Sequence, residues 1–407
     1  MELLHNAVRA YAWGSRTAIA EMLGREVPAP HPEAELWMGA HPGDPSRVIG
    51  PDGTRRSLLD LLAEDPRGQL GDGCAERFGG RLPFLLKVLA AEEPLSLQAH
   101  PSAEQAAFGF AAEDAAGLAV DSPIRNYKDP SAKPELICAL TEFHALAGFR
   151  APDRTVALLR SLDAPDLAPY TELLAAQPDG SGLRALFTTL ITLPQNSLDG
   201  LLPQVLDACV AHVKDRGEFD AECRTALELG EAYPGDAGVL AALLLNRIVL
   251  SPGEAIYLPA GNLHAYLHGT GVEILANSDN VLRCGLTPKH VDVPELMRVL
   301  DFSSGDMPVQ RGEPTRPGLW VYRTPCPEFE LSRIELAAGE SVEVDHGGPQ
   351  ILLCARGSAT LSVHRGGHAD VLELRRGQSV WLPAADPALR VEATEDAQLF
   401  RATPGVP

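Results

Sequence analysis

The sequence predicts a mainly β protein, built from two related β-barrels with an α-helical region inserted into the first. Three observations predict this class. Short apolar runs separated by Gly- and Pro-rich turn signals fill the chain before residue 150 and after residue 247. Between them, apolar residues recur at the three- and four-residue intervals of amphipathic helices. A seven-residue pattern from Gly to Pro occurs at both 253–259 and 377–383, and a duplicated β unit explains this repeat most simply.

These patterns divide the 407 residues into three parts. Residues 1–150 together with 247–310 form the first barrel, residues 151–246 the helical insertion, and residues 311–407 a second barrel. More than one unit is expected because single cores usually stop growing at about 250–300 residues. The Gly- and Pro-rich stretch 305–318 between the barrels is expected to be a linker.

Composition and charge exclude several classes of protein. A formal net charge of −21 repels polyanions, so neither nucleic acid nor an anionic membrane is expected as a partner. The chain has no basic leader before an apolar run and no apolar stretch of about 18 residues, which predicts a cytoplasmic location without membrane contact. Seven scattered cysteines without a C-x-x-C pair predict reduced, mostly buried thiols.

Two strand-like segments carry polar side chains on a single face. A period of two places Ser96, Gln98 and His100 together, and it also places Lys133 and Glu135 together. Taken separately, a hydrogen-bonded core histidine and a solvated Lys–Glu pair are sufficient interpretations. Imidazole and carboxylate are also ordinary zinc donors that leave a coordination position open for water or substrate.

The first copy of the repeated pattern continues to a histidine. It runs from Gly253 through Pro259 and Gly261 to His264, and it resembles the second motif of the cupin family of small β-barrels. In that family a turn delivers a strand whose histidine points into the barrel. The second copy lacks the later glycine and the histidine, so we expect a degenerate barrel without metal.

A β-hairpin is expected after His264, with Gly269 and Gly271 at its tip. His268 would lie on the exposed turn and Glu273 on the returning strand. The following segment, 277–283, is a dense polar loop, and polar loops carried by a rigid sheet often contribute to functional sites.

Six segments of the chain resemble the type I mannose-6-phosphate isomerase family, in the family's order. They are residues 11–15, 34–42, 82–89, 95–101, 133–135 and 278–289. Beyond residue 311 the resemblance is only architectural.

The resemblance implies one zinc ion per chain and an enzyme that interconverts mannose 6-phosphate and fructose 6-phosphate. The partner is then a small sugar phosphate, and the chain is expected to be a monomer in the cytoplasm. The implied zinc ligands are Gln98, His100, Glu135 and His264. The implied cleft contains Ser96, Lys133, Glu273, Arg283 and Lys289, with Lys87, Trp13, Glu35 and Trp37 nearby.

Aldose–ketose isomerisation moves a proton between neighbouring carbons through an enediol, so it requires a base and cations that face the developing oxyanion. We expect Glu273 as the base, Arg283 and Lys289 at the phosphate and oxyanion, and Lys133 near the reacting oxygens. Where the family commonly has a histidine before Lys-Pro-Glu, this chain has Ala132. A mechanism that uses this histidine as acid or base therefore cannot apply unchanged.

Two other functions remain open at this point. A cupin-type sugar epimerase or metal-dependent oxygenase is one, although such oxygenases tend to hold iron with two histidines and one carboxylate. Oxygen consumption would identify the oxygenase. The other is a sugar-phosphate-binding barrel without catalytic activity, which predicts ligand binding without turnover.

Overall fold

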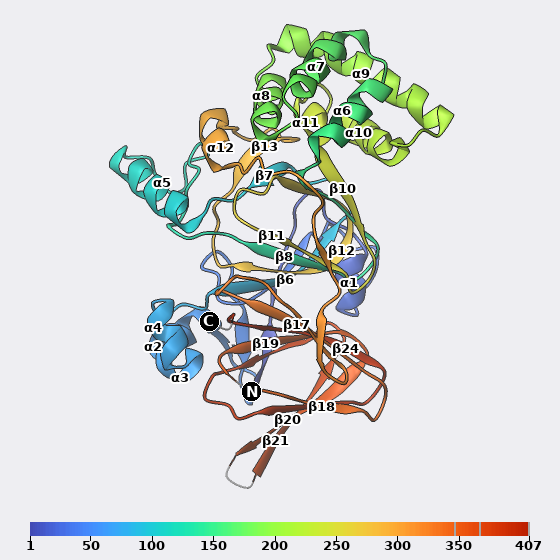
Figure 1. Cartoon of the computed structure of the whole chain (residues 1–407). Coiled ribbons are helices and arrows are strands. Elements are labelled where there is room, and N and C mark those ends of the chain that lie inside the picture. The colour runs from blue at the N-terminus through green and yellow to red at the C-terminus, as the bar shows by residue number, and fades with distance from the viewer. Residues whose placement is uncertain (346, 366–367, 406–407) are drawn as a thin grey trace.

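The computed structural model describes residues 1–345, 347–365 and 368–405. It shows a β-rich chain with antiparallel sheets and one helical region, as predicted (Figure 1). The helices α6–α11 of this region (residues 152–242) lie at the top of Figure 1, an 11-stranded sheet lies in the middle, and a nine-stranded and a four-stranded sheet lie below.

The middle sheet combines strands from both sides of the helical region. Its central path runs β14-β11-β8-β12-β6-β3-β2, and β7, β9, β10 and β13 pair beside it. The strands are β2 (Ala7–Arg9), β3 (Glu35–Met38), β6 (Phe84–Ala91), β7 (Leu97–Ala99), β8 (Glu135–Ala139), β9 (Phe143–Phe149), β10 (Leu245–Leu250), β11 (Ala255–Leu258), β12 (His264–Ala276), β13 (Leu282–Gly285) and β14 (Val309–Gln310).

The lower sheets contain the C-terminal strands and three strands from the start of the chain. In the nine-stranded sheet, β1 pairs with both β22 and β4. Its members are β1 (Glu2–His5), β4 (Arg47–Ile49), β5 (Arg55–Ser57), β15 (Glu313–Arg316), β16 (Leu319–Tyr322), β17 (Glu330–Leu336), β19 (Gln350–Arg356), β22 (Ser379–Leu382) and β24 (Ala397–Thr403). The four-stranded sheet consists of β18 (Ser341–Val344), β20 (Ser358–Arg365), β21 (His368–Arg375) and β23 (Leu389–Ala393).

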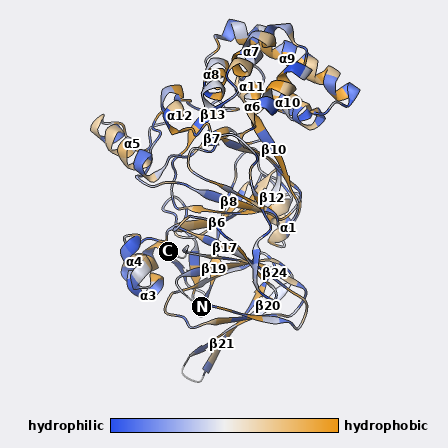
Figure 2. Cartoon of the chain, viewed as in Figure 1, coloured by the Kyte–Doolittle hydropathy of each residue, from blue (hydrophilic) through white to orange (hydrophobic). Residues whose placement is uncertain are grey.

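The helical region begins at Pro152, as the apolar spacing predicts. Its elements are α6 (Pro152–Ser161), the 3-10 helix η1 (Pro165–Leu167), α7 (Ala168–Ala176), α8 (Gly180–Ile191), α9 (Gln195–Asp215), α10 (Asp220–Ala232) and α11 (Gly238–Ala242). The longer helices carry both hydrophilic and hydrophobic residues along their length (Figure 2). Their apolar faces share one core with Leu97, Leu146 and Leu282 of the middle sheet, so this region packs against the strands that carry the polar residues identified above.

The remaining helices surround the sheets. They are α1 (Ala18–Met22), α2 (Leu58–Glu64), α3 (Pro66–Leu70), α4 (Asp72–Arg77), α5 (Ala103–Ala115) and α12 (Val293–Val299). Helix α5 begins with a capping box, in which the Ser102 hydroxyl accepts from the Gln105 N–H and the Gln105 side chain accepts from the Ser102 N–H.

The predicted hairpin after His264 is wrong, because β12 is a single 13-residue strand. Its beginning pairs with β7 and β9, and its end pairs with β6 and β8. A register shift between Tyr266 and His268 marks a bulge, and Gly269 adopts a φ of 118° next to it. Glycines that permit a turn also permit such a bulge, and pairing with distant strands favours the bulge here.

The predicted linker at 305–318 contains two short strands. β14 pairs with β11 of the middle sheet, and β15 pairs with β16 of the nine-stranded sheet. Both lie at the ends of their sheets, where a strand tolerates proline because one side needs no ladder hydrogen bonds.

The seven cysteines are free thiols, six of them buried and Cys74 half-buried. This agrees with the prediction of reduced thiols. In the described part of the chain, no helix has both the length and the apolar character required to cross a bilayer.

Candidate active site

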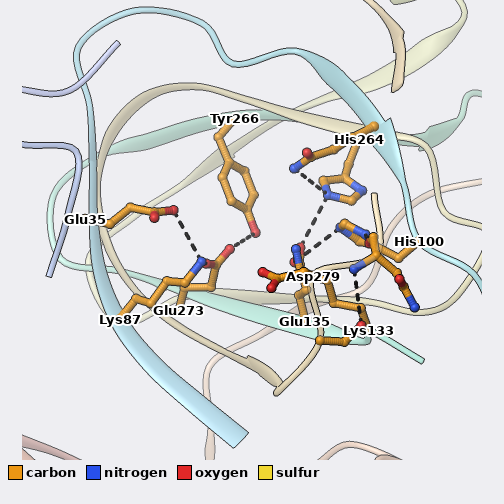
Figure 3. A network of polar contacts seen from close by, with 12 residues as sticks. Glu35, Lys87, His100, Lys133, Glu135, His264, Tyr266, Glu273 and Asp279 are labelled. Atoms are coloured by element: carbon orange, nitrogen blue, oxygen red, sulfur yellow. Dashed lines mark hydrogen bonds and ion pairs between the residues drawn. The ribbon is translucent and has the colours of Figure 1, made fainter. Parts of the chain in front are cut away.

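Three strands bring four of the predicted metal ligands together. Gln98 lies in β7 and His100 directly follows it, whereas Glu135 and His264 are the first residues of β8 and β12. Gln98 and His264 are direct cross-strand partners. Each ligand thus lies at or near a strand end, and the side chains of His100, Glu135 and His264 point toward one another (Figure 3).

The carboxylate of Glu135 lies between the two imidazoles. Its Oε1 is 3.2 Å from His100 Nε2, and its Oε2 is 3.4 Å from His264 Nε2. The Gln98 amide nitrogen is 3.5 Å from the same His264 nitrogen. Flipping this amide would present its oxygen, a suitable metal donor, at the same point.

Main-chain carbonyls determine the tautomer of both histidines. His100 Nδ1 lies 2.7 Å from the carbonyl oxygen of Asn280, and His264 Nδ1 lies 3.0 Å from that of Asn262. A carbonyl only accepts, so each Nδ1 carries the proton and each Nε2 presents a lone pair. Burial lowers the pKa of His100 to about 4, which keeps this imidazole neutral near pH 7.

The donor set fits a zinc ion. One donor atom from each of His100, Glu135 and His264 falls within a group whose members lie within 4.8 Å of one another. Within the described residues, His100 Nε2 and Glu135 Oε2 are buried and lack a hydrogen-bond partner. Buried polar atoms without partners are costly, and two imidazoles with one carboxylate are ordinary zinc ligands.

A second polar network lies on the neighbouring strands β3, β6 and β12. Lys87 Nζ is 3.3 Å from both Glu35 Oε1 and Glu273 Oε2. The Tyr266 hydroxyl donates to Glu273 Oε1 at 3.0 Å, and the Trp37 indole donates to Glu35 Oε2 at 2.8 Å. Figure 3 shows this network and the group of His100, Glu135 and His264 enclosed by the same strands.

Burial controls the charges of this network. Glu273 is only 3% exposed, and its desolvation raises its pKa despite the opposing charge of Lys87. Desolvation acts against the charge of Lys87 as well, but Glu35 and Glu273 outweigh it and raise the pKa of Lys87 above its ordinary value. Lys87 is therefore a permanent cation between two buried carboxyl groups.

Lys133 forms an ion pair with one of the predicted metal ligands. Its Nζ lies 3.2 Å from Glu135 Oε1. Burial disfavours the charged form of Glu135, but the neighbouring His100 and Lys133 hold the pKa of Glu135 well below its usual value. A cation thus faces the interior beside the metal ligands, as the shared strand face predicts.

Arg283 and Lys289 lie outside both networks. Over residues 1–345, 347–365 and 368–405, neither side chain has a hydrogen-bond or ion-pair partner. Burial lowers the pKa of Arg283, and burial together with the charge of Arg283 lowers the pKa of Lys289. Arg283 is also the cross-strand partner of Gln98, so it lies beside the strand of a predicted metal ligand, and its charge acts on Lys289.

The remaining predicted residues, Ser96 and Trp13, have other surroundings. Ser96 is half-buried just before β7, and Trp13 stacks on Tyr11 with ring centroids 5.7 Å apart. Neither side chain has a hydrogen bond to the networks in the described part of the chain. Ala132 lines a cavity of about 960 Å³ together with His41 and Asp279.

Tyr266 and Asp279 are polar residues of the site that the sequence did not single out. A period of two from His264 already places Tyr266 on the same face. Asp279 lies 3.3 Å from His41 Nε2. Partial burial opposes its ionisation, but the hydrogen bond from His41 lowers the pKa of Asp279 overall. Its only signal in the sequence was the density of polar residues at 277–283.

The chain is similar to proteins of one family. The model of the phosphomannose isomerase type I catalytic domain matches residues 1–152. Mannose-6-phosphate isomerase of Escherichia coli strain K12 is 39% identical over 398 residues, which cover 96% of this chain and 97% of that protein. The Homo sapiens protein of the same name is 32% identical, with 97% and 96% covered.

Solved structures show the same similarity. A zinc-bound mannose 6-phosphate isomerase superposes with a TM-score of 0.88 at 36% identity, covering 100% of this chain and 99% of that chain. A mutant of the phosphomannose isomerase from Salmonella typhimurium gives a TM-score of 0.89 at 36% identity, with 100% of both chains covered.

Proposed function

The chain belongs to the mannose-6-phosphate isomerase family, and from this premise we propose that it interconverts mannose 6-phosphate and fructose 6-phosphate with one bound zinc ion. The observation that carries the proposal is that two sets of buried polar side chains lie together inside the middle sheet. One is the donor set of His100, Glu135 and His264, and the other pairs Glu273 with Lys87.

His100, Glu135 and His264 would hold the zinc ion, with Gln98 as a fourth ligand through its amide oxygen. A relative of the same fold was solved with zinc bound. Bound zinc would supply a Lewis acid beside the substrate's oxygens. The donor set of this chain contributes a single negative charge, that of Glu135, which leaves the centre cationic toward an anionic substrate.

Glu273 would act as the base of the isomerisation. Its carboxylate removes the proton from carbon 2 of the aldose while oxygen 1 gains a proton, and the enediol forms. Return of a proton to carbon 1, with loss of the proton on oxygen 2, completes the ketose. Lys87 and the Tyr266 hydroxyl fix the carboxylate through its two oxygens, and this fixed position favours one direction of attack.

The side chain at position 132 cannot transfer the proton between the substrate's hydroxyl oxygens, since alanine has no titratable group. Lys133 is the nearest titratable group in sequence, and its side chain is 11% exposed beside Glu135. We propose Lys133 as the group that faces the reacting oxygens, where its charge stabilises an oxyanion.

Arg283 and Lys289 would bind the phosphate. A sugar phosphate carries a charge of about −2 near pH 7, and an unpaired arginine can make two parallel hydrogen bonds to it. In a chain with a net charge of −21, such a local pair of cations is what permits an anionic substrate to approach.

Replacing Arg283 with alanine is expected to raise KM and to lower kcat/KM by about 10- to 100-fold. The lost charge-assisted hydrogen bonds are worth roughly 1.5–3 kcal/mol. Steady-state kinetics at two salt concentrations checks this, because the variant should also respond less to salt. Arg298→Ala removes an exposed arginine on α12 and serves as the matched control. Unchanged KM in Arg283→Ala would assign the phosphate to other residues.

The function is tested by a coupled assay that follows fructose 6-phosphate formed from mannose 6-phosphate. Turnover should disappear after chelation and return after addition of zinc. Binding of mannose 6-phosphate by folded, zinc-loaded protein without turnover would instead establish a sugar-phosphate-binding barrel.

We further propose that the sheets close into two cupin-like jelly-roll barrels, with residues 151–246 as the insertion and 311–407 as the core of the second barrel. The antiparallel pairing throughout the large sheets supports this description, and the shared strands β1, β4 and β5 add the start of the chain to the second barrel.

A further inference from the structure

Two loops that are distant in sequence are joined through one buried side chain. The loops are residues 128–131, which precede β8, and residues 278–280, which precede β13. Asn280 is the last residue of the second loop, its side chain contacts the first loop, and it is 0% exposed. Burying an amide at this depth is costly unless all its polar atoms are paired.

The Asn280 amide uses both its donor and its acceptor atoms on one loop. Its Nδ2 donates to the carbonyls of Asp129 at 2.7 Å and Ser131 at 2.9 Å. Its Oδ1 accepts from the N–H groups of Lys128 at 2.7 Å and Asp129 at 3.2 Å. A single side chain thereby satisfies four main-chain groups of the segment 128–131.

The main chain of Asn280 contacts a metal ligand. Its carbonyl accepts from His100 Nδ1 at 2.7 Å, and this contact fixes both the tautomer and the ring orientation of His100. The residue therefore contacts His100 through its backbone and the 128–131 loop through its side chain.

The loop that Asn280 holds leads directly into another proposed ligand, Glu135. Ser131 is two residues before Lys133 and four residues before Glu135, and Glu135 begins β8. Displacement of the Ser131 carbonyl would move the start of this strand. Glu135 lies 3.2 Å from His100, so a small shift changes the distance between the two donor groups.

Asp129 and Ser278 fix the position of Asn280 from both sides. One carboxylate oxygen of Asp129 accepts from the Ser278 hydroxyl at 3.1 Å and from the Asp279 N–H at 2.8 Å. The Asn280 N–H donates to the Ser278 hydroxyl oxygen at 3.2 Å. The two loops thus form one hydrogen-bonded unit, which does not depend on Asn280 alone for its fold.

We propose that Asn280 is a positioning residue of the metal centre, which sets the relative placement of His100 and Glu135. This inference rests on the proposed function, because it requires the centre to bind zinc. Asn280 acts through its neighbours and does not itself ligate the metal.

The test compares the zinc affinity of four purified full-length proteins by competition with a chromophoric chelator. Asn280→Ala removes the amide, and Asn280→Asp keeps an acceptor oxygen but has no N–H to donate. Asn277→Ala is the matched control, because its amide lies in the same polar loop and donates to the Leu82 carbonyl. Melting temperatures with and without zinc provide a readout apart from turnover.

Both Asn280 variants are expected to bind zinc about 10- to 100-fold more weakly than the unmodified chain, the usual effect of losing a residue that orients metal ligands. Their zinc-induced rise in melting temperature should shrink accordingly, and the loss should be at least as large in Asn280→Asp, whose carboxylate would face the Asp129 and Ser131 carbonyls. Asn277→Ala should keep the affinity of the unmodified chain.

Equal zinc affinity in the Asn280 variants, with only a lower melting temperature of the zinc-free protein, would overturn the inference and leave a purely structural role. If both variants fail to fold, Ser278→Ala provides the test, because it removes the hydroxyl that accepts from the Asn280 N–H. This variant should bind zinc several-fold more weakly. An unchanged zinc affinity would overturn the inference. Failure of the unmodified chain to bind zinc would refute the proposed function instead, before any variant is compared.

Discussion

Glu273→Gln is expected to lower kcat by about 10²- to 10⁴-fold, the usual range for loss of a general base. Glutamine has nearly the same shape but cannot accept a proton, and Lys87 keeps Glu35 as a partner at 3.3 Å. Zinc content and melting temperature should change little, because Glu273 is not among the proposed ligands. Steady-state kinetics at saturating substrate measures the effect.

Glu142→Gln is the matched control for this variant, since Glu142 is exposed just before β9 and its carboxylate contacts His144 rather than either buried network. It should retain full activity. A kcat in Glu273→Gln within tenfold of the unmodified chain would exclude Glu273 as the base and transfer the role to another group of the buried network.

The same carboxyl should determine the acid limb of the pH profile. A base acts when it is deprotonated. We therefore expect kcat/KM to reach its maximum above the pKa of Glu273 and to fall as the pH drops through that pKa. Burial raises this pKa above the ordinary value of 4.5, so the decline begins at a higher pH than for an exposed carboxyl. Lys87→Met removes the cation that opposes this shift and should move the limb further upward. Bound zinc is measured at each pH, because loss of metal would produce a separate decline.

Replacing His264 with alanine is expected to abolish zinc binding and to reduce turnover by about 10³-fold or more, since metal stabilisation of oxygen charge is worth several kcal/mol. Only His100 and Glu135 of the buried group would remain, with Gln98 as a weak donor. Metal analysis of the purified variant and the coupled assay with added zinc measure both effects.

His268→Ala provides the control on the same strand. His268 is exposed, and its ring centroid lies 6.3 Å from that of His144 in an edge-on arrangement. Its loss should therefore affect neither zinc content nor turnover. Full zinc-dependent turnover in His264→Ala would contradict the donor set proposed here.

Strand periodicity in the sequence places several residues of the candidate site on shared strand faces. The two-residue alternation of an extended chain is local, so it places Gln98 with His100 and Lys133 with Glu135 without knowledge of their neighbours. Their assembly into one group is not local. His264 lies 166 positions from Gln98 in the sequence, and only the resemblance to a known family connected them.

The region around Gly269 shows where local reasoning failed. The glycines are compatible with a hairpin or with a bulge in a continuous strand. The choice depends on β6 and β8, which pair with the second half of β12 through residues 84–91 and 135–139. Sequence spacing near the glycines contains no information about those partners.

By itself, the sequence determined the mainly β class, the helical region from residue 152, the strand faces that carry the donor residues and the membership of a zinc isomerase family. The tertiary structure alone decided that β12 continues past its glycines as one strand with a bulge, that Tyr266 holds Glu273, and that Asn280 is buried. The physical reason is the same in each case. Backbone periodicity is a property of neighbouring residues, whereas burial and pairing depend on segments that only the folded chain brings together.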